Sequence, residues 1–201
     1  IQTSSYIVKY ILKKGESIGS FYGFKTDGLY TQAAIDAGHY YTLSGVVPNA
    51  GDIKFVPQRD IEYKQEITDE DRTILGKDVP DFTYGVNLSL QYKGFEFSMF
   101  GQGISGTKVA FDVYGVHPFY HGQDSPRKYH LKRWTEENPN PHAAYPRIYS
   151  ASSVHTTYNR NFSDYHLFDS DYFRFKTLSL GYTVPSATVK NWGLQSLKVY
   201  V

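Results

Sequence analysis

The sequence predicts an all-β fold, and three observations support this. Apolar and polar residues alternate with a period of two along several stretches, most clearly from Phe82 to Tyr92. Aromatic residues, which favour strands, make up 17% of the 201 residues, with 19 Tyr and 13 Phe. Helical signals are few and short, and no apolar run approaches the ~18 residues that a membrane-spanning helix needs.

Charge and composition exclude several classes of protein. The net charge is +1 and the isoelectric point is about 8.0. Domains that bind nucleic acid usually carry a basic stripe and an isoelectric point above ~9, so we expect no nucleic-acid partner. Because the chain has no Cys, disulfides and Cys-ligated metal sites are excluded. The mean hydropathy of −0.47 is that of a hydrophilic chain, which makes the aromatic excess unusual.

Residues 82–92 predict one long strand with two different faces. Its length suits a tilted membrane strand of about 9–11 residues, whereas globular strands average about 5–6. Lys93 and Gly94 predict a two-residue hairpin, after which Phe95, Phe97 and Met99 alternate with polar residues. One predicted face is apolar and would meet lipid in a membrane barrel: Phe82, Tyr84, Val86, Leu88, Leu90 and Tyr92. Polar positions that would then line the lumen are Asn87, Gln91, Glu96 and Gln102.

Periodicity alone leaves two architectures open. Aromatic residues near the turn end are typical of the interfacial girdle of an outer-membrane barrel. The same alternation fits a half-buried antiparallel sheet in a soluble, aromatic-rich β-sandwich that binds carbohydrate. The two differ over the apolar face of residues 82–92, which contacts lipid in a barrel and a second sheet in a sandwich.

The remaining elements are shorter. Further strands are predicted at 5–12, 21–28, 108–114, 172–183 and 194–201. Along 172–183 the apolar residues change from odd-numbered to even-numbered positions near Lys176 and Thr177. This change indicates either a β-bulge or the point at which the strand passes from a loop into the bilayer. Helical segments are predicted at 31–37, at 68–71 and, as a solvated surface helix, from Ser125 to Trp134. Residues 120–162 predict a structured loop, because they combine Pro residues with aromatics that disordered linkers lack.

Six segments, in order, resemble the C-terminal part of SusC/RagA-like TonB-linked outer-membrane proteins. They are 19–30 (GSFYGFKTDGLY), 51–55 (GDIKF), 69–85 (DEDRTILG to PDFTYG), 92–96 (YKGFE), 134–147 (WTEENP to YPR) and 171–185 (DYFRFKTLSLGYTVP). The resemblance implies an antiparallel transmembrane β-barrel segment, part of a 22-stranded barrel, with long extracellular loops and short loop helices. It also implies that residues 1–201 are an incomplete C-terminal part, with the plug and the last strand outside them.

The resemblance further implies a function. Such proteins import oligosaccharides, or in some members peptides, across the outer membrane of Gram-negative bacteria. Their partners are a SusD-like surface lipoprotein and the TonB complex, which would engage an N-terminal region outside these residues. The acidic calcium-type loop of many members is replaced here by residues 56–67, where Arg59 and Lys64 stand among the would-be ligands, so we expect no calcium.

No catalytic chemistry is predicted. His117 and His121 have a metal-compatible spacing, but Gly115, Pro118 and Gly122 break any helix, so we expect no metal and no cofactor, and all seven histidines are predicted to be solvated. A glycoside hydrolase would need a carboxylate pair such as Glu136 and Glu137, which we expect to be solvated.

Ligand contact is most plausible in the long loop. Its candidates, which offer rings for stacking and one guanidinium, are Tyr120, Trp134, Tyr145 and Arg147. The alternative is that Trp134 and Tyr145 pack the loop against itself or against the lipoprotein.

Overall fold

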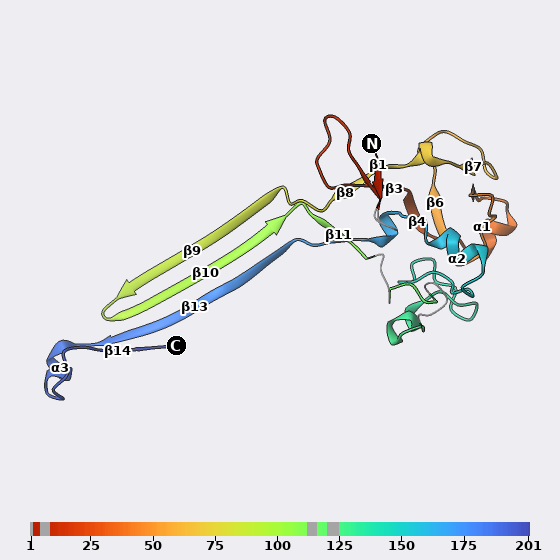
Figure 1. The fold of residues 1–201 in the computed structure, drawn as a ribbon. Coiled ribbons are helices and arrows are strands. Elements are labelled where there is room, and N and C mark those ends of the chain that lie inside the picture. Colours follow the sequence, from red (N-terminus) through yellow and green to blue (C-terminus); the bar gives the residue numbers. More distant parts are fainter. Residues whose placement is uncertain (1, 5–8, 112–115, 120–124) are drawn as a thin grey trace. The chain divides into compact units, whose positions relative to one another are not determined.

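The computed structural model describes residues 2–4, 9–111, 116–119 and 125–201 (Figure 1). The chain forms two compact units. Unit 1 contains Ile1–Asp78 and Lys108–Phe168, and unit 2 contains Val79–Thr107 and Asp169–Val201. Strands, arranged in five sheets, are the commonest regular element of the described residues, and the helices are few and short. Within this described part, no helix combines the length and the apolar character needed to cross a membrane.

Unit 2 is an antiparallel sheet of four strands in the order β14-β13-β10-β9. Figure 1 shows the long strands β9 (Phe82–Tyr92), β10 (Phe95–Ser105) and β13 (Tyr172–Val184) side by side. Strand β9 has the bounds that the alternation predicts. Lys93 and Gly94 form the predicted tight turn with φ of 45° and 87°, and two positive φ values are typical of the type I′ hairpin.

A bulge in β13 confirms the predicted change in the alternation of apolar and polar residues. Phe100 of β10 lies opposite Thr177 and Gly101 opposite Phe175, so Lys176 has no partner on β10. Because an unpaired extra residue reverses the alternation, Phe175 and Leu178 come to lie on the same side of the sheet.

The register therefore gives the sheet two distinct faces, since directly opposed residues project to the same side. We define the apolar face as the following residues: Phe82, Tyr84, Val86, Leu88, Leu90, Tyr92, Phe95, Phe97, Met99, Phe173, Phe175, Leu178, Leu180, Tyr182, Val184, Leu197 and Val199. We define the polar face as the residues between them; it includes Asn87, Gln91, Glu96 and Gln102, together with the ion pair of Glu96 and Lys198. Phe100, Ile104, Tyr172 and Tyr200 are apolar exceptions on the polar face.

Strand β10 extends beyond the predicted alternation because two glycines continue its apolar face. A Cβ at Gly103 would lie 2.5 Å from the ring of Tyr84, and one at Gly101 would meet the ring of Phe173. These two rings stack on each other, with centroids 6.1 Å apart and an angle of 4°. The rings thus cover the space that side chains at 101 and 103 would otherwise fill.

The strand predicted at 194–201 is confirmed over residues 197–200. A short helix, α3 (Ser186–Lys190), follows Pro185, and β14 is confined to Leu197–Tyr200. Val189 of this helix is fully buried. Such a short element leaves no periodicity for a sequence pattern to reveal.

Unit 1 contains the other four sheets. The largest has the order β1 (Gln2–Ser4), β2 (Lys9–Ile11), β3 (Ser20–Gly23) and β8 (Thr73–Lys77). Three two-stranded sheets pair β4 (Lys25–Leu29) with β6 (Ile53–Val56), β5 (Thr42–Leu43) with β7 (Glu66–Ile67), and β11 (Lys108–Ala110) with β12 (Leu167–Asp169). Residues 5–8 and 112–115, which belong to two predicted strands, lie outside the described residues.

The single strand predicted at 21–28 is wrong, because the chain changes sheet at Phe24. Strand β3 ends at Gly23 and β4 begins at Lys25 in a different sheet. Phe24 instead pairs with residues near the end of the long loop. Its N–H donates to the carbonyl of Phe162 (3.0 Å), and its carbonyl accepts from the N–H of Asp164 (3.1 Å). A Cβ at Gly23 would lie 2.5 Å from the Phe162 carbonyl oxygen, so this approach requires glycine.

The helices agree with prediction in part. Helix α1 (Gln32–Asp36) is capped by Thr31, whose hydroxyl accepts from the N–H of Ala34. The turn predicted at 68–71 is the 3₁₀ helix η1 (Asp69–Asp71). The helix predicted from Ser125 to Trp134 is only a 3₁₀ turn, η3 (Lys128–Lys132), and helix α2 (Val154–Asn159) and the 3₁₀ turn η4 (Asp164–His166) complete the described part of the long loop.

The core of unit 1 brings the β4–β6 region against this long loop. Its fully buried apolar cluster consists of Phe24, Leu29, Leu43, Ala50, Ile53, Phe55, Ile67, Trp134 and Tyr158. Phe55 makes edge-to-face contacts with Phe24 and Tyr158 at centroid distances of 5.7 and 5.2 Å. The described residues 125–162 therefore form the structured loop that their aromatic content predicts.

Candidate functional site

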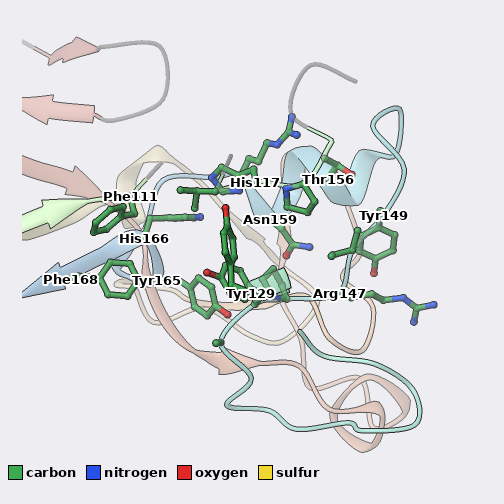
Figure 2. Close-up of a pocket in the computed structure, with 17 residues that line it drawn as sticks. Phe111, His117, Tyr129, Arg147, Tyr149, Thr156, Asn159, Tyr165, His166 and Phe168 are labelled. Carbon is green, nitrogen blue, oxygen red and sulfur yellow. The ribbon is translucent and has the colours of Figure 1, made fainter. Parts of the chain in front are cut away.

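A cavity of about 500 Å³ lies in unit 1 and is lined by the long loop and by the residues that precede and follow it (Figure 2). Figure 2 shows Phe111 and Phe168 at one end and Tyr149 and Arg147 at the other. The residues that line it are Phe111, Val116, His117, Pro118, Tyr129, Ala144, Tyr145, Pro146, Arg147, Ile148, Tyr149, Thr156, Asn159, Arg160, Tyr165, His166 and Phe168. This volume lies in the range of about 300–1,000 Å³ that is usual for ligand pockets.

One wall is the extended segment 143–149, which backbone hydrogen bonds hold in place. The N–H of Trp134 donates to the carbonyl of Tyr145 (2.9 Å), and the N–H of Arg147 donates to the carbonyl of Gly51 (2.8 Å). At the start of the segment, the hydroxyl of Tyr165 donates to the carbonyl of Ala143 (3.0 Å). The wall is thus fixed to three separate parts of unit 1.

Helix α2 forms the opposite wall, and a buried carboxylate positions it. Asp52 is fully buried and accepts hydrogen bonds from Nδ2 of Asn159 and Nδ1 of His155, both at 2.8 Å. The side-chain oxygen of Asn159 in turn accepts from the N–H of Ile53 (2.8 Å). Every partner in this network is satisfied, so it joins the loop before β6 rigidly to α2.

Aromatic rings form the floor between these walls. Tyr145 lies edge-to-face against His130 at 5.0 Å and beside Tyr129 at 5.7 Å. His130 is buried because both of its ring nitrogens are bonded: Nδ1 accepts from the N–H of Arg127 and Nε2 lies 2.7 Å from the carbonyl of Val116. The prediction that the histidines are solvated is therefore wrong for His130, and also for His166, which is 4% exposed.

The tyrosine hydroxyls of the site are neutral. Burial raises the pKa of Tyr149 and of Tyr165 far above the ordinary value. Burial, with a smaller contribution from Tyr129, also raises the pKa of Tyr145. Because a raised pKa favours the protonated phenol, none of the three ionises near neutral pH.

The structure brings two of the four predicted ligand residues to the cavity, Tyr145 and Arg147. Trp134 is 4% exposed and belongs to the core cluster, which is the packing arrangement that the sequence left open. The Arg147 guanidinium lies 5.5 Å from the rings of both Trp134 and Tyr149 and 2.9 Å from Glu136. Tyr120 and His121 lie outside the described residues. Among the described residues, no three acidic, His or Cys side chains are arranged to hold a metal ion.

Sequence reasoning missed several lining residues, chiefly Tyr149, Asn159 and Tyr165. Tyr149 follows Tyr145 in one uninterrupted stretch, 144–149, that lines the cavity. The density of tyrosines in this stretch is the signal that could have identified it. Asn159 gave no such signal, because its role depends on Asp52, more than a hundred positions away.

The loop at 56–72, where the sequence departs from the resembling family, is organised by an ion pair. Asp71 is fully buried and accepts from Nε and Nη2 of Arg59 at 3.1 and 2.7 Å and from the N–H of Thr68 at 2.9 Å. Burial alone would raise the pKa of Asp71, but the hydrogen bonds from Arg59 and from backbone N–H groups lower it to about 2. Asp71 is therefore ionised and closes the loop through Arg59.

Comparisons with known proteins bear on both units. None of the protein-family models matches the sequence. TonB-dependent receptor P3 of Formosa agariphila is 30% identical over 191 residues, which cover 95% of this chain and 18% of that protein. TonB-dependent receptor P26 of the same organism is 29% identical over 188 residues, 93% of this chain and 18% of that protein. The chain is homologous to TonB-dependent receptors.

Solved structures agree at the level of the fold. The RagAB peptide importer in its 'open-open' state matches with a TM-score of 0.58 and 18% identity over 95% of this chain and 19% of that one. Its 'closed-closed' state matches with a TM-score of 0.57 and 17% identity over 99% of this chain and 20% of that one. The chain thus spans about a fifth of the length of these relatives.

The homology confirms the predicted location. TonB-dependent receptors are outer-membrane proteins of Gram-negative bacteria, and the chain is homologous to them. The relatives are named as receptors, which fits the expectation that the chain is not an enzyme. The sheets of the described residues agree with the β fold class that the sequence predicts.

Proposed function

We propose that the chain is part of the barrel wall and extracellular loops of an outer-membrane, TonB-dependent importer. One observation carries this proposal: the bulge at Lys176 aligns the apolar residues of β13 with those of β9 and β10, so that one side of the sheet is continuously apolar. Leu90, Phe175 and Leu178 on that face are 56%, 61% and 67% exposed. An exposed apolar face of this size is expected to be covered by lipid or by another protein.

The length of the strands supports lipid as the covering. Strand β9 has 11 residues, and at about 3.3 Å per residue and a tilt near 40° it spans roughly 28 Å. The apolar band of an outer-membrane barrel is about 25 Å tall and is flanked by aromatic residues. Aromatic rings lie at both ends of the apolar face, with Phe82 and Tyr84 at one end and Tyr92 and Phe95 at the other.

In this arrangement the apolar face of β9 (Phe82, Tyr84, Val86, Leu88, Leu90, Tyr92) contacts lipid. The polar face, with Asn87, Gln91, Glu96 and Gln102, lines the lumen. Among the described residues, β9 and β14 are the outer strands of this sheet, and each would pair with a neighbouring strand of a 22-stranded wall. The short turn at Lys93 faces the periplasm and the long loop at 120–162 is extracellular, since outer-membrane barrels have short periplasmic turns and long outer loops.

The imported substrate is an oligosaccharide or a peptide, held in part by Tyr145 and Arg147, with Trp134 and Tyr120 as further candidates. A SusD-like surface lipoprotein and the TonB complex are the proposed partners. The name of the relatives supports the dependence on TonB, and the description of the RagAB structures as a peptide importer supports import.

Cysteine labelling in the full-length receptor tests the orientation of the sheet. The 201 residues contain no Cys, so a single thiol introduced here is unique within this segment. Leu88→Cys and Ser89→Cys are neighbours on opposite faces of β9. In isolated outer membranes, we expect a charged maleimide to modify the Ser89→Cys variant and to spare the Leu88→Cys variant. Equal modification of both would contradict the proposal.

The soluble sandwich makes the opposite prediction for the whole receptor. If the receptor were a soluble sandwich, it would partition into the aqueous phase and remain monodisperse without detergent, whereas an importer requires detergent.

Import itself is tested by uptake of labelled oligosaccharides and peptides into cells with and without TonB. Metabolic labelling with an alkyne fatty acid should show a lipoprotein that copurifies with the receptor, and its absence would remove the proposed partner.

A further inference from the structure

The cavity in unit 1 has an interior made mainly of carbon. Its walls include the apolar side chains of Phe111, Val116, Ile148 and Phe168 and the rings of several tyrosines. Phe111 and Phe168 close one end with an edge-to-face contact at 5.3 Å. Such a surface gains free energy when an apolar group displaces water from it.

Several polar side chains of the lining are already engaged within the chain, and the Tyr149 hydroxyl, which has no hydrogen-bond partner among the described residues, is buried away from solvent. Thr156 donates its hydroxyl to the carbonyl of Ser150 (2.7 Å), and Tyr165 donates to the carbonyl of Ala143 (3.0 Å). Asn159 uses its amide nitrogen on Asp52 and its amide oxygen on the N–H of Ile53. These groups therefore support the walls and are not offered to a ligand.

The charged lining residues are engaged as well. Arg147 pairs with Glu136 at 2.9 Å and lies over the rings of Trp134 and Tyr149. His166 shares a hydrogen bond with the hydroxyl of Ser163 (3.3 Å). His117, Tyr129 and Arg160 also interact with other groups of the chain.

This distribution of polar groups discriminates between ligand classes. A sugar ring carries several hydroxyls, and each one buried without a partner loses its hydrogen bonds to water. An aromatic or branched aliphatic side chain has no such requirement and gains from burial against the rings. A cavity of about 500 Å³ has room for one large side chain and part of the flanking backbone.

We propose that this cavity binds an aromatic or large aliphatic side chain of a peptide. The inference rests on the proposed import function and makes peptides, among the two substrate classes considered there, the ligand of this site. In a peptide, the apolar side chain can be buried without hydroxyl groups, whereas the apolar C–H face of a sugar ring is bordered by hydroxyls that would be buried with it.

The test uses the purified full-length receptor and two variants with the same chemical change. Ala144→Phe introduces a ring at the lining of the cavity, because Ala144 is an exposed residue that lines it. Ala151→Phe is the control, since Ala151 is exposed and does not line the cavity. The probes are a mixture of synthetic tetrapeptides with Phe at one position, the same mixture with Ser at that position, and oligosaccharides of two to six hexose units. Binding is measured by calorimetry, and heat-modifiable migration in gels verifies that each variant is folded.

We expect the Phe peptides to bind about tenfold more tightly than the Ser peptides, from burial of one ring. Ala144→Phe should abolish that preference and Ala151→Phe should retain it. If Ala144→Phe fails to fold, Ile148→Ala, which shortens the wall without adding bulk, should reduce the preference instead. Equal binding of both peptide mixtures, or oligosaccharide binding that Ala144→Phe weakens, overturns the inference. If either of these results is found but TonB-dependent uptake persists, the proposed import function is not contradicted. If the unmodified receptor neither partitions into membranes nor takes up substrate, the proposed import function itself is wrong.

Discussion

Gly51 lies directly against the indole of Trp134. A Cβ at position 51 would come within 2.5 Å of two ring carbons of Trp134, and the φ of Gly51 is +88°, which side chains rarely adopt. These residues belong to two sequence segments, 51–55 and 134–147, that are more than eighty positions apart. Their contact is the point at which the β6 region fixes the wall of the cavity.

The substitution Gly51→Ala should loosen this wall. Both the positive φ and the steric overlap with Trp134 oppose a side chain, and we expect a loss of about 1–3 kcal/mol in local stability. Hydrogen exchange of the full-length receptor is the measurement, because the amides of Trp134 and Arg147 are hydrogen-bonded on either side of the contact. Gly45→Ala is the control: its φ is +71° but nothing lies within 4 Å, so it isolates the backbone term. Equal effects of the two substitutions would show that the contact with Trp134 is unimportant.

The substitution Asp71→Ala should open the loop at 56–72. It removes the acceptor of the Gln58, Arg59 and Thr68 amides, which are partly buried, and a buried donor left unpaired costs at most about 1–3 kcal/mol. We expect faster hydrogen exchange at these three positions. Asp60→Ala, at an exposed position of the same loop, should leave them unchanged. Unchanged exchange in the Asp71→Ala receptor would mean that the loop is held by other contacts.

The same carboxylate predicts a pH dependence. The pKa of Asp71 is lowered from 3.8 to about 2, so its charge stabilises the folded loop at every pH above about 4. That stabilisation is lost as the pH falls from about 4 to about 2, because the unfolded loop binds the proton first. Protection factors of the Arg59 and Thr68 amides should therefore be constant from pH 7 to pH 5 and fall below pH 4. A fall centred near pH 6 would assign the effect to another group.

The bulge at Lys176 predicts a specific pattern of thiol accessibility. Single cysteines at Arg174, Phe175, Thr177 and Leu178 should fall into two classes in isolated outer membranes. The variants at 175 and 178 should behave alike and resist a charged maleimide, and those at 174 and 177 should react. A regular strand would instead pair 175 with 177, so the labelling pattern distinguishes the two registers.

Asn159→Asp should destabilise the region between β6 and α2. The introduced carboxylate would replace the amide that donates to Asp52, so two buried acceptors would face each other. We expect a loss of about 3 kcal/mol or more at pH 7 and a smaller loss at pH 5, because one carboxyl can then bind a proton and donate it to the other. Exchange of the Ile53 amide at both pH values is the readout. Asn140→Asp, which keeps its acceptor role toward the His142 N–H at an exposed site, is the control.

How far the fold could be predicted depended on how far apart in the sequence the interacting residues lie. Strand β9 was predicted to its exact bounds, because alternation is a local property of eleven consecutive residues. The bulge at Lys176 could also be predicted from local sequence, because the apolar residues change from odd-numbered to even-numbered positions there. The break at Phe24 did not, since Phe24 leaves its sheet to pair with Phe162, and the strand pattern on either side is uninterrupted.

The candidate site was predicted less completely for the same reason. Tyr145 and Arg147 stood out as aromatic and basic residues in a long loop. Asn159 and His130 acquire their roles from partners distant in the sequence or from backbone groups, which no single-sequence pattern reports. The length of β10 was underestimated because Gly101 and Gly103 continue its apolar face without any apolar side chain.

The two connections of β10 imply an order of folding. Strands β9 and β10 are joined by a turn of two residues, so their pairing closes almost no loop. Strand β13 must instead find β10 across the whole segment from Gly106 to Asp171, whose ordering entropy opposes the encounter until the segment itself has formed contacts. The hairpin at Lys93 can therefore form early and locally, whereas the addition of β13 waits for the long loop. Substitutions that weaken the loop core should slow completion of the sheet even though they lie outside it.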